Sequence, residues 1–265
     1  MLPYPNIGPV LLELGPFHLR WYSVMYIIGL VTVYYFSRHA SRKGSLKLNF
    51  QEIESVMLYG LIGMIVGARL TYVIVYSSGH YLLHPLEIFA TWKGGLSFHG
   101  AILGISAAIW IYARRHNKSF LNITDHICAV APVGLGFGRI GNFINGELWG
   151  RTTEAAIGMV FPDAGPFPRH PSQLYESFFE GWVLLGIMLL FYKARPRTGV
   201  ISSFFLIFYA TFRFFIEFFR EPDAHLGAVI GAFSMGQVLC AVMWVCGALL
   251  LTYTLNVKDS KPSAA

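Results

Sequence analysis

The chain has 265 residues, of which 55% are hydrophobic and only 13% are charged. Soluble domains carry about 25% charged residues, so this composition argues against an ordinary soluble domain and for a membrane protein. The formal net charge is +6, but we find no nucleic-acid-binding motif, and in a membrane protein the placement of Lys and Arg matters more than their sum. The three cysteines have no CxxC-type spacing, so we expect small buried side chains and no metal site.

Seven apolar stretches are long enough, or nearly so, for the roughly 20 residues that cross a bilayer. They are residues 19–36, 53–76, 96–113, 123–144, 174–192, 200–219 and 233–255. Four prolines discourage a continuous helix in the first eighteen residues, which we expect to lie along the outer surface. We therefore predict an all-α polytopic membrane protein with seven transmembrane helices, forming one integral membrane domain over residues 1–265.

Basic residues in the connections predict the orientation. The connections after the first, third and fifth segments, together with the tail, hold twelve: Arg38, Arg42, Lys43, Lys47, Arg114, Arg115, Lys118, Lys193, Arg195, Arg197, Lys258 and Lys261. The opposite side holds Arg20, Lys93, Arg151, Arg169 and Arg220. By the positive-inside rule, the N-terminus lies outside and the C-terminus is cytoplasmic.

The connection between the fourth and fifth segments is the long external one. Residues 146–172 contain several turn-forming Pro and Gly residues and a short strand-like run, IGMVF, at 157–161. This composition predicts a small extramembrane cap inserted between helices 4 and 5.

Residues 138–150 read GRIGNFINGELWG and bring polar side chains into the fourth apolar segment. Arg139, Asn142 and Asn145 are each three residues apart, so on a helix they share roughly one face. A charge at membrane depth costs about 2.5–3.5 kcal/mol on insertion scales and needs a partner or a wet cavity. We therefore expect an anionic group beside Arg139.

Polar residues of the other segments gather at the same depth. With the orientation assigned, the outer halves hold Tyr22, Tyr26, Arg69, Ser97, His99, Arg139, Asn142, Gln173, Glu176, Glu180, Arg213, Glu217, Arg220, Ser234 and Gln237. The inner halves are nearly free of ionisable groups. This agreement predicts one polar cavity that opens toward the outer leaflet.

Two interpretations of the buried charges remain open. On the sixth segment Tyr209, Arg213, Glu217 and Arg220 form one stripe, and Arg213 could simply pair with Glu217 across a turn. Alternatively, the arginines bind a lipid phosphate, because the guanidinium fork suits bidentate phosphate recognition. The sequence also leaves open whether Arg69 and Arg220 bind substrate or hold the bundle together.

His99 lies in the glycine-rich run GGLSFHG at 94–100. A lone histidine on an apolar face is often a satisfied core residue. Its depth, however, matches that of the arginines, and its unperturbed pKa of about 6.5 suits a general base.

These motifs together resemble the bacterial prolipoprotein diacylglyceryl transferases. The resemblance rests on GRIGNFINGELWG, with GGLSFHG upstream and HPSQLYES and FREPD downstream, and it extends over essentially the full length. One departure is Ala101, where many members of the family carry glycine.

The resemblance implies transfer of the diacylglyceryl group from phosphatidylglycerol to the lipobox cysteine thiol of a prolipoprotein, with release of glycerol-1-phosphate. Its partners would be phosphatidylglycerol, the prolipoprotein signal peptide and membrane lipid, without metal or cofactor. Its location would be the bacterial inner membrane, with the N-terminus, the cap and the active site on the periplasmic side.

The implied site has distinct roles for its residues. Arg139 and Arg213 would grip the phosphate, and His99 is the first candidate for the base that takes the thiol proton, with Glu147 the second. The remaining residues assigned to the site are Tyr26, Asn142, Gly150, Tyr209, Glu217 and Arg220. The rival functions are an organic-anion transporter that uses the same arginines and a lipid-headgroup enzyme with another acceptor.

Overall fold

A computed structural model of the chain describes residues 2–5, 7–15, 17–76, 80–221, 228–230 and 233–256. Each apolar stretch predicted from the sequence coincides with helical structure. The helices are α1 (Trp21–Arg42), α2 (Phe50–Thr71) with η1 (Tyr72–Tyr76), α4 (Phe98–Arg115), α5 (Phe120–Ile144), α6 (Ser172–Glu176) continuing through η4 (Ser177–Val183) into α7 (Leu184–Lys193), α8 (Val200–Ile216) and α9 (Met235–Asn256).

Among the described residues, four helical stretches are long and apolar enough to cross a membrane. They are Phe50–Ile74, Phe120–Ile144, Ser172–Lys193 and Met235–Asn256, and α8 is a shorter apolar helix. The chain is therefore a mostly helical membrane protein. The prediction of seven crossings and of their orientation goes beyond this finding and stays a prediction. The tail lysines used in the charge count, Lys258 and Lys261, lie outside the described residues.

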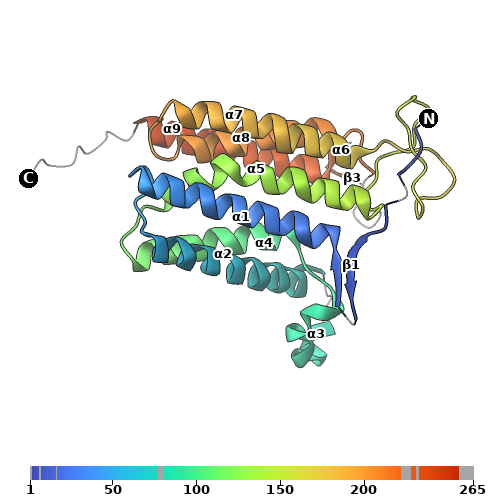
Figure 1. Ribbon diagram of the computed structural model, residues 1–265, viewed down its shortest axis with the longest axis horizontal. Helices are drawn as coiled ribbons and strands as arrows, with labels where there is room; N and C mark the ends of the chain where they lie inside the picture. The colour runs from blue at the N-terminus through green and yellow to red at the C-terminus, as the bar shows by residue number, and fades with distance from the viewer. Residues whose placement is uncertain are drawn as a thin grey trace, which may run out of the picture. The chain divides into compact units, whose positions relative to one another are not determined.

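The chain forms two compact units, Met1–Phe36 with Thr124–Ala265, and Ser37–Ile123. In the first unit, which holds most of the predicted site, α5, α7, α8 and α9 pack around one core (Figure 1). Its helix core is built from Ala129, Leu184, Met188, Ile201 and Tyr209.

Glycines allow two close helix contacts in the first unit. A Cβ atom on Gly29 of α1 would lie 2.8 Å from Cα of Gly134 in α5. A Cβ atom on Gly181 of η4 would lie 2.5 Å from Cα of Gly136, again in α5. Such small residues let helix backbones approach closely where lipid supplies no hydrophobic driving force. The second contact brings α5 against the helix that carries Glu176.

In the second unit α2 packs along α4 in the same way. Cβ atoms on Gly63 and Gly67 would both collide with the backbone of Gly104. This unit also contains α3 (His80–Leu83), η2 (Pro85–Phe89) and η3 (Thr91–Lys93), which connect α2 with α4.

The N-terminal stretch is not helical, as its prolines predict, but it forms a hairpin that the sequence did not reveal. Strands β1 (Val10–Leu14) and β2 (Phe17–Arg20) pair antiparallel, and β3 (Ala228–Ile230) pairs with β4 (Phe233–Ser234). The fold is therefore mostly α, with two short strand pairs.

The connection between α5 and α6 forms turns around a small hydrophobic cluster of Phe143, Met159 and Phe161. Tyr4 packs on this cluster, and its hydroxyl donates to the carbonyl oxygen of Phe143 at 2.7 Å. The prediction of a strand at 157–161 is wrong: only Met159 forms a bridge there, with Arg169. Glycine and proline on both sides explain why the pairing does not extend.

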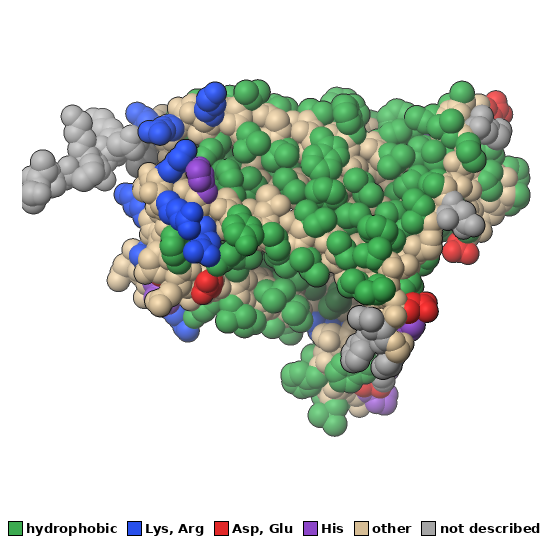
Figure 2. Space-filling model, viewed as in Figure 1, with side chains coloured by type: hydrophobic (Ala, Val, Ile, Leu, Met, Phe, Trp, Pro, Cys, Tyr) green, Lys and Arg blue, Asp and Glu red, His purple; other side chains and the backbone are tan. Residues whose placement is uncertain are grey.

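Hydrophobic side chains cover a broad face of the helices of the first unit (Figure 2). Leu190, Phe215 and Leu249 are among its strongly exposed large side chains. Lys and Arg side chains gather at the end of these helices where α7 stops. Lys193 is the last residue of α7, and Arg195 follows it. A continuous apolar surface of this kind is expected where lipid is the solvent.

Candidate functional site

The candidate site is a cluster of buried charges built around Glu176, the last residue of α6. Arg139 Nε, from α5, lies 2.6 Å from Glu176 Oε2. Arg213 Nη1, from α8, donates to Glu176 Oε1 at 2.9 Å, and Arg220 Nη1 approaches the same oxygen at 3.4 Å. One carboxylate therefore brings together guanidinium groups from α5, from α8 and from the turn that follows α8.

Glu217 forms the second anchor of the cluster. It follows α8, and Arg213 Nη2 lies 2.6 Å from its Oε2 atom, which is the pairing across one turn that the structural interpretation predicts. The hydroxyl of Ser234 donates to Glu217 Oε1 at 2.9 Å. Gly236, at the start of α9, leaves room for this carboxylate, because a Cβ atom there would lie 2.7 Å from Oε1.

Glu180 is the third carboxylate and lies one helical turn after Glu176. Its oxygens are each 3.8 Å from a guanidinium nitrogen, one of Arg139 and one of Arg213. Together the cluster holds three arginines and three glutamates. The anionic partner expected for Arg139 is thus present within the protein itself.

The acids and the arginines of this cluster differ in exposure. The side chains of Glu176 and Glu180 are 0% exposed, whereas those of Arg139, Arg213 and Arg220 are between 12% and 16% exposed. The arginines therefore keep a small exposed fraction that Glu176 and Glu180 lack. A guanidinium group has five N–H donors, so the contacts with Glu176 leave other donors for an anion.

Asn142 and Glu147 belong to a polar loop at the end of α5. The side-chain amides of Asn142 and Asn145 both donate to Glu147 Oε1, at 2.9 and 3.1 Å. The amide of Gln173 donates to the carbonyl oxygen of Glu147 at 2.6 Å. Asn142 is buried while Glu147 is exposed, so this loop can present a carboxylate to a ligand in a defined position.

Gly150 is buried against the chain that follows α8. It forms a bridge with Arg220, and its N–H donates to the carbonyl oxygen of His170 at 2.9 Å. A Cβ atom on Gly150 would collide with the carbonyl oxygen of Phe219 and would lie 2.7 Å from His170 Cβ. The close approach needs glycine here, and it fixes the backbone that carries Arg220.

The two predicted tyrosines lie in different surroundings. Tyr26 of α1 is half exposed, and its ring lies 5.0 Å from that of Tyr22, whose hydroxyl donates to it at 3.3 Å. Tyr209 is buried in the helix core, and its ring stacks on Phe205. Tyr209 lies one helical turn before Arg213, so it can support the cluster from within α8.

His99 belongs to the second compact unit, in the first turn of α4. Its side chain lies outside the part that the structure describes, and its role stays a prediction.

Arg69 has a structural role. Its Nε atom donates to the carbonyl oxygen of Ile88 at 2.8 Å, and its Nη atoms donate to those of Glu87 and Gly94 at 2.6 and 2.7 Å. This guanidinium group holds the segment before α4 against α2. These contacts support the interpretation that Arg69 helps hold the structure together.

Glu176 and Glu180 are the site residues that the sequence-based assignment missed. The available signal was their spacing of four residues inside an apolar segment, which places two carboxylates on one helix face.

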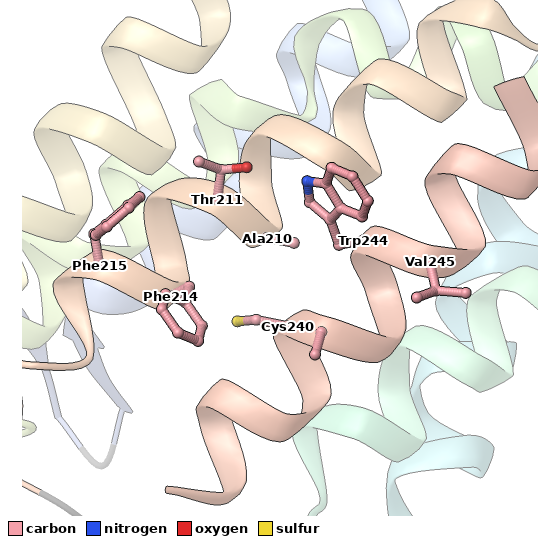
Figure 3. Close-up of a pocket in the computed structure, with 8 residues that line it drawn as sticks. Ala210, Thr211, Phe214, Phe215, Cys240, Trp244 and Val245 are labelled. Carbon is pink, nitrogen blue, oxygen red and sulfur yellow. The ribbon is translucent and has the colours of Figure 1, made fainter. Parts of the chain in front are cut away.

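An open groove of about 380 Å³ lies elsewhere, between α8 and α9 (Figure 3). It is lined by Ala210, Thr211, Phe214, Phe215, Cys240, Ala241, Trp244 and Val245. None of these is charged, so the groove suits hydrocarbon.

The chain matches one protein family and several of its members over nearly its full length. Residues 9–253 match the family model described as prolipoprotein diacylglyceryl transferase. The chain is 45% identical to a protein of Photobacterium profundum, over 97% of each chain, and 46% identical to one of Oleidesulfovibrio alaskensis, over 100% of this chain and 98% of the relative. A protein of Bordetella avium is 43% identical over 99% of this chain and 100% of its own. All three are named phosphatidylglycerol–prolipoprotein diacylglyceryl transferase.

Proposed function

Because the chain belongs to the prolipoprotein diacylglyceryl transferase family, we propose that it transfers the diacylglyceryl group of phosphatidylglycerol to the lipobox cysteine of prolipoproteins. In this reaction the cysteine sulfur attacks the glyceryl carbon that carries the phosphate. The carbon–oxygen bond breaks, a thioether forms, and glycerol-1-phosphate leaves. This is the first step of bacterial lipoprotein maturation.

The convergence of Arg139 and Arg213 on Glu176 is the observation that supports this function best. The phosphate of the lipid binds the accessible edges of these two guanidinium groups, while the buried carboxylates hold them in place. Negative charge develops on the phosphate as the carbon–oxygen bond breaks. Preorganised cations at that point stabilise the transition state more than the ground state.

The attacking thiol must lose its proton, because a cysteine has a pKa of about 8.5 and only the thiolate is a strong nucleophile. His99 takes this proton, with Glu147 as the second candidate. A His99→Asn variant that keeps most of its activity between about pH 6 and pH 8 excludes histidine as the base.

The other assigned residues complete the substrate site. Asn142 orients Glu147 through the contact at the end of α5. Glu217 and Arg220 extend the charged surface next to Arg213, and Gly150 fixes the backbone of Arg220. Tyr26 contacts substrate, and Tyr209 supports the arginines.

Both substrates are membrane-bound, so the reaction fits a multi-pass protein of the bacterial inner membrane. In this arrangement seven helices cross the bilayer within one domain over residues 1–265. The N-terminus and the cap at 146–172 are periplasmic, and the active site faces the periplasmic leaflet. The signal peptide with its lipobox cysteine and the lipid reach the site laterally, and glycerol-1-phosphate leaves into water.

The test is incubation of the purified protein with phosphatidylglycerol and a lipobox peptide, followed by mass spectrometry of the peptide. We expect a mass gain equal to one diacylglyceryl group and the appearance of glycerol-1-phosphate. A peptide whose cysteine is replaced by serine is the control and should stay unmodified. Anion flux in liposomes without peptide modification would instead support the transporter.

A further inference from the structure

Glu180 differs from the other carboxylates of the cluster because no described group donates a hydrogen bond to either of its oxygens. Its side chain is 0% exposed. The guanidinium groups of Arg139 and Arg213 stay at 3.8 Å, beyond hydrogen-bond distance. An ionised carboxylate in this position has lost its hydration without full compensation.

Glu176 and Glu217 have closer partners than Glu180 has. Glu176 meets three arginines, and Glu217 accepts from both Arg213 and Ser234. Charge-assisted hydrogen bonds of this kind would weaken if the carboxylate took up a proton.

The charges of the cluster sum to zero when all three glutamates are ionised against Arg139, Arg213 and Arg220. A phosphodiester bound on the arginines adds one negative charge inside a region of low dielectric constant, where an unbalanced charge is costly. One proton on a carboxylate restores the balance. Of the three carboxylates, Glu180 is the one with no hydrogen bond on either oxygen, so it is the one that takes the proton at least cost.

We propose that Glu180 carries a proton while an anionic phosphate lipid is bound, so that lipid binding and protonation of this one carboxyl group are coupled. The inference rests on the proposed function and names Glu180 as a positioning residue for it. The proton comes from solvent, and the only bond formed is the O–H bond of Glu180.

The groups that face Glu180 come from several elements. They are Arg139 from α5, Glu176 from its own helix, Tyr209 and Arg213 from α8, Arg220 after α8 and Cys240 from α9. The tyrosine and the cysteine are neutral at ordinary pH. The arginines stay charged, so Glu180 is the member of this set that can adjust the total charge to the ligand.

The experiment measures the affinity of the full chain in detergent for dioctanoyl phosphatidylglycerol, between about pH 6 and pH 9. We expect the affinity of the unaltered protein to fall toward high pH, by at most about tenfold per pH unit, which is the limit for uptake of one proton. The Glu180→Gln variant mimics the protonated carboxyl group. Its affinity should stay constant over this range and exceed that of the unaltered protein at the alkaline end.

Two controls separate this effect from a general loss of charge. Glu154→Gln removes the same charge from an exposed position outside the cluster and should keep the pH dependence. Dioctanoylglycerol lacks the phosphate and should bind without pH dependence.

The inference is overturned if the unaltered protein binds the lipid equally well across this range, or if Glu180→Gln follows the same pH curve as the unaltered protein. If Glu180→Gln does not fold, infrared difference spectra of the unaltered protein decide. Adding lipid at about pH 9 should produce the carbonyl band of a protonated carboxylic acid, and its absence contradicts the inference. Failure of the unaltered protein to bind phosphatidylglycerol at any pH would overturn the proposed function itself.

Discussion

Arginine is suited to the centre of this site because one guanidinium group can meet two carboxylates at once. Arg213 contacts Glu176 through Nη1 and Glu217 through Nη2. The planar fork holds the cation in one orientation, which an ammonium group on a flexible stem does not do.

We predict that Arg213→Lys and Arg139→Lys lose at least about 100-fold in the rate of diacylglyceryl transfer, the scale found when a single preorganised donor is removed. The charge is kept, so thermal stability should fall less than in the alanine variants, which leave buried carboxylates without partners. Initial rates with the lipobox peptide and thermal midpoints in detergent measure the two effects. Lys193→Ala, at an exposed position, is the control. A lysine variant with near-normal turnover would remove that arginine from the mechanism.

Glu176 is the shared counter-ion of the cluster, since it contacts all three arginines. We expect Glu176→Gln to destabilise the protein by about 3–5 kcal/mol, because three arginines lose their shared counter-ion. The thermal midpoint and the transfer rate should fall together. Glu154→Gln, in an exposed part of the cap, should change neither. Unaltered stability of Glu176→Gln would show that Glu180 and Glu217 suffice to hold the arginines.

At the scale of elements, close contact between α5 and η4 places Arg139 beside Glu176. The contact is made by Gly136 and Gly181, and the hydroxyl of Ser177 donates to the carbonyl oxygen of Gly136 at 2.9 Å. Arg139 lies three residues after Gly136 and Glu176 five residues before Gly181, so the short distance between the backbones brings the two charges close together.

A methyl group at this contact should separate the two helices. We predict that Gly181→Ala destabilises the protein by roughly 1–3 kcal/mol, the usual range for overpacking, and lowers the transfer rate. Gly186→Ala in α7 is the matched control, because a Cβ atom there would meet nothing within 4 Å. Equal thermal midpoints of the two variants would mean that the contact does not position Arg139.

The helices were predictable because each is a long apolar run, and α5 was placed to within a few residues. The hairpin of β1 and β2 was not predictable, because prolines indicate only that a helix is absent. The convergence of Arg139 with Arg213 followed from their common depth. Glu176 was placed at the same depth, but its pairing with these two arginines was not predicted, because it lies 37 residues from each of them in the sequence. Arg69 could not be interpreted from the sequence because its partners are backbone carbonyl groups, which carry no signature of residue type.

For the whole molecule, the proposed orientation puts the cap and the arginine cluster on the periplasmic side. Within the first unit, the cap connection and α6 lie at one end of the helices, and the end of α7 lies at the other (Figure 1). The basic residues Lys193, Arg195 and Arg197 follow α7, as expected for the cytoplasmic side.

Single-cysteine labelling tests this orientation. In a chain whose three native cysteines are replaced by alanine, Glu154→Cys should react with an impermeant maleimide on intact spheroplasts. Lys193→Cys should react only after the membrane is permeabilised. Both positions are exposed, so accessibility within the protein does not limit the reaction. The reverse pattern would invert the topology and place the cluster in the inner leaflet.

The central claim is that guanidinium groups from α5 and α8 together bind the phosphate of one lipid. The most direct measurement is an experimental structure of the protein in lipid nanodiscs with phosphatidylglycerol bound. We predict that phosphate oxygens lie at charge-assisted hydrogen-bond distance, about 2.7–2.9 Å, from both Arg139 and Arg213, with Glu176 still paired with them. A lipid phosphate bound elsewhere, with both arginines held only by the glutamates, would contradict the claim.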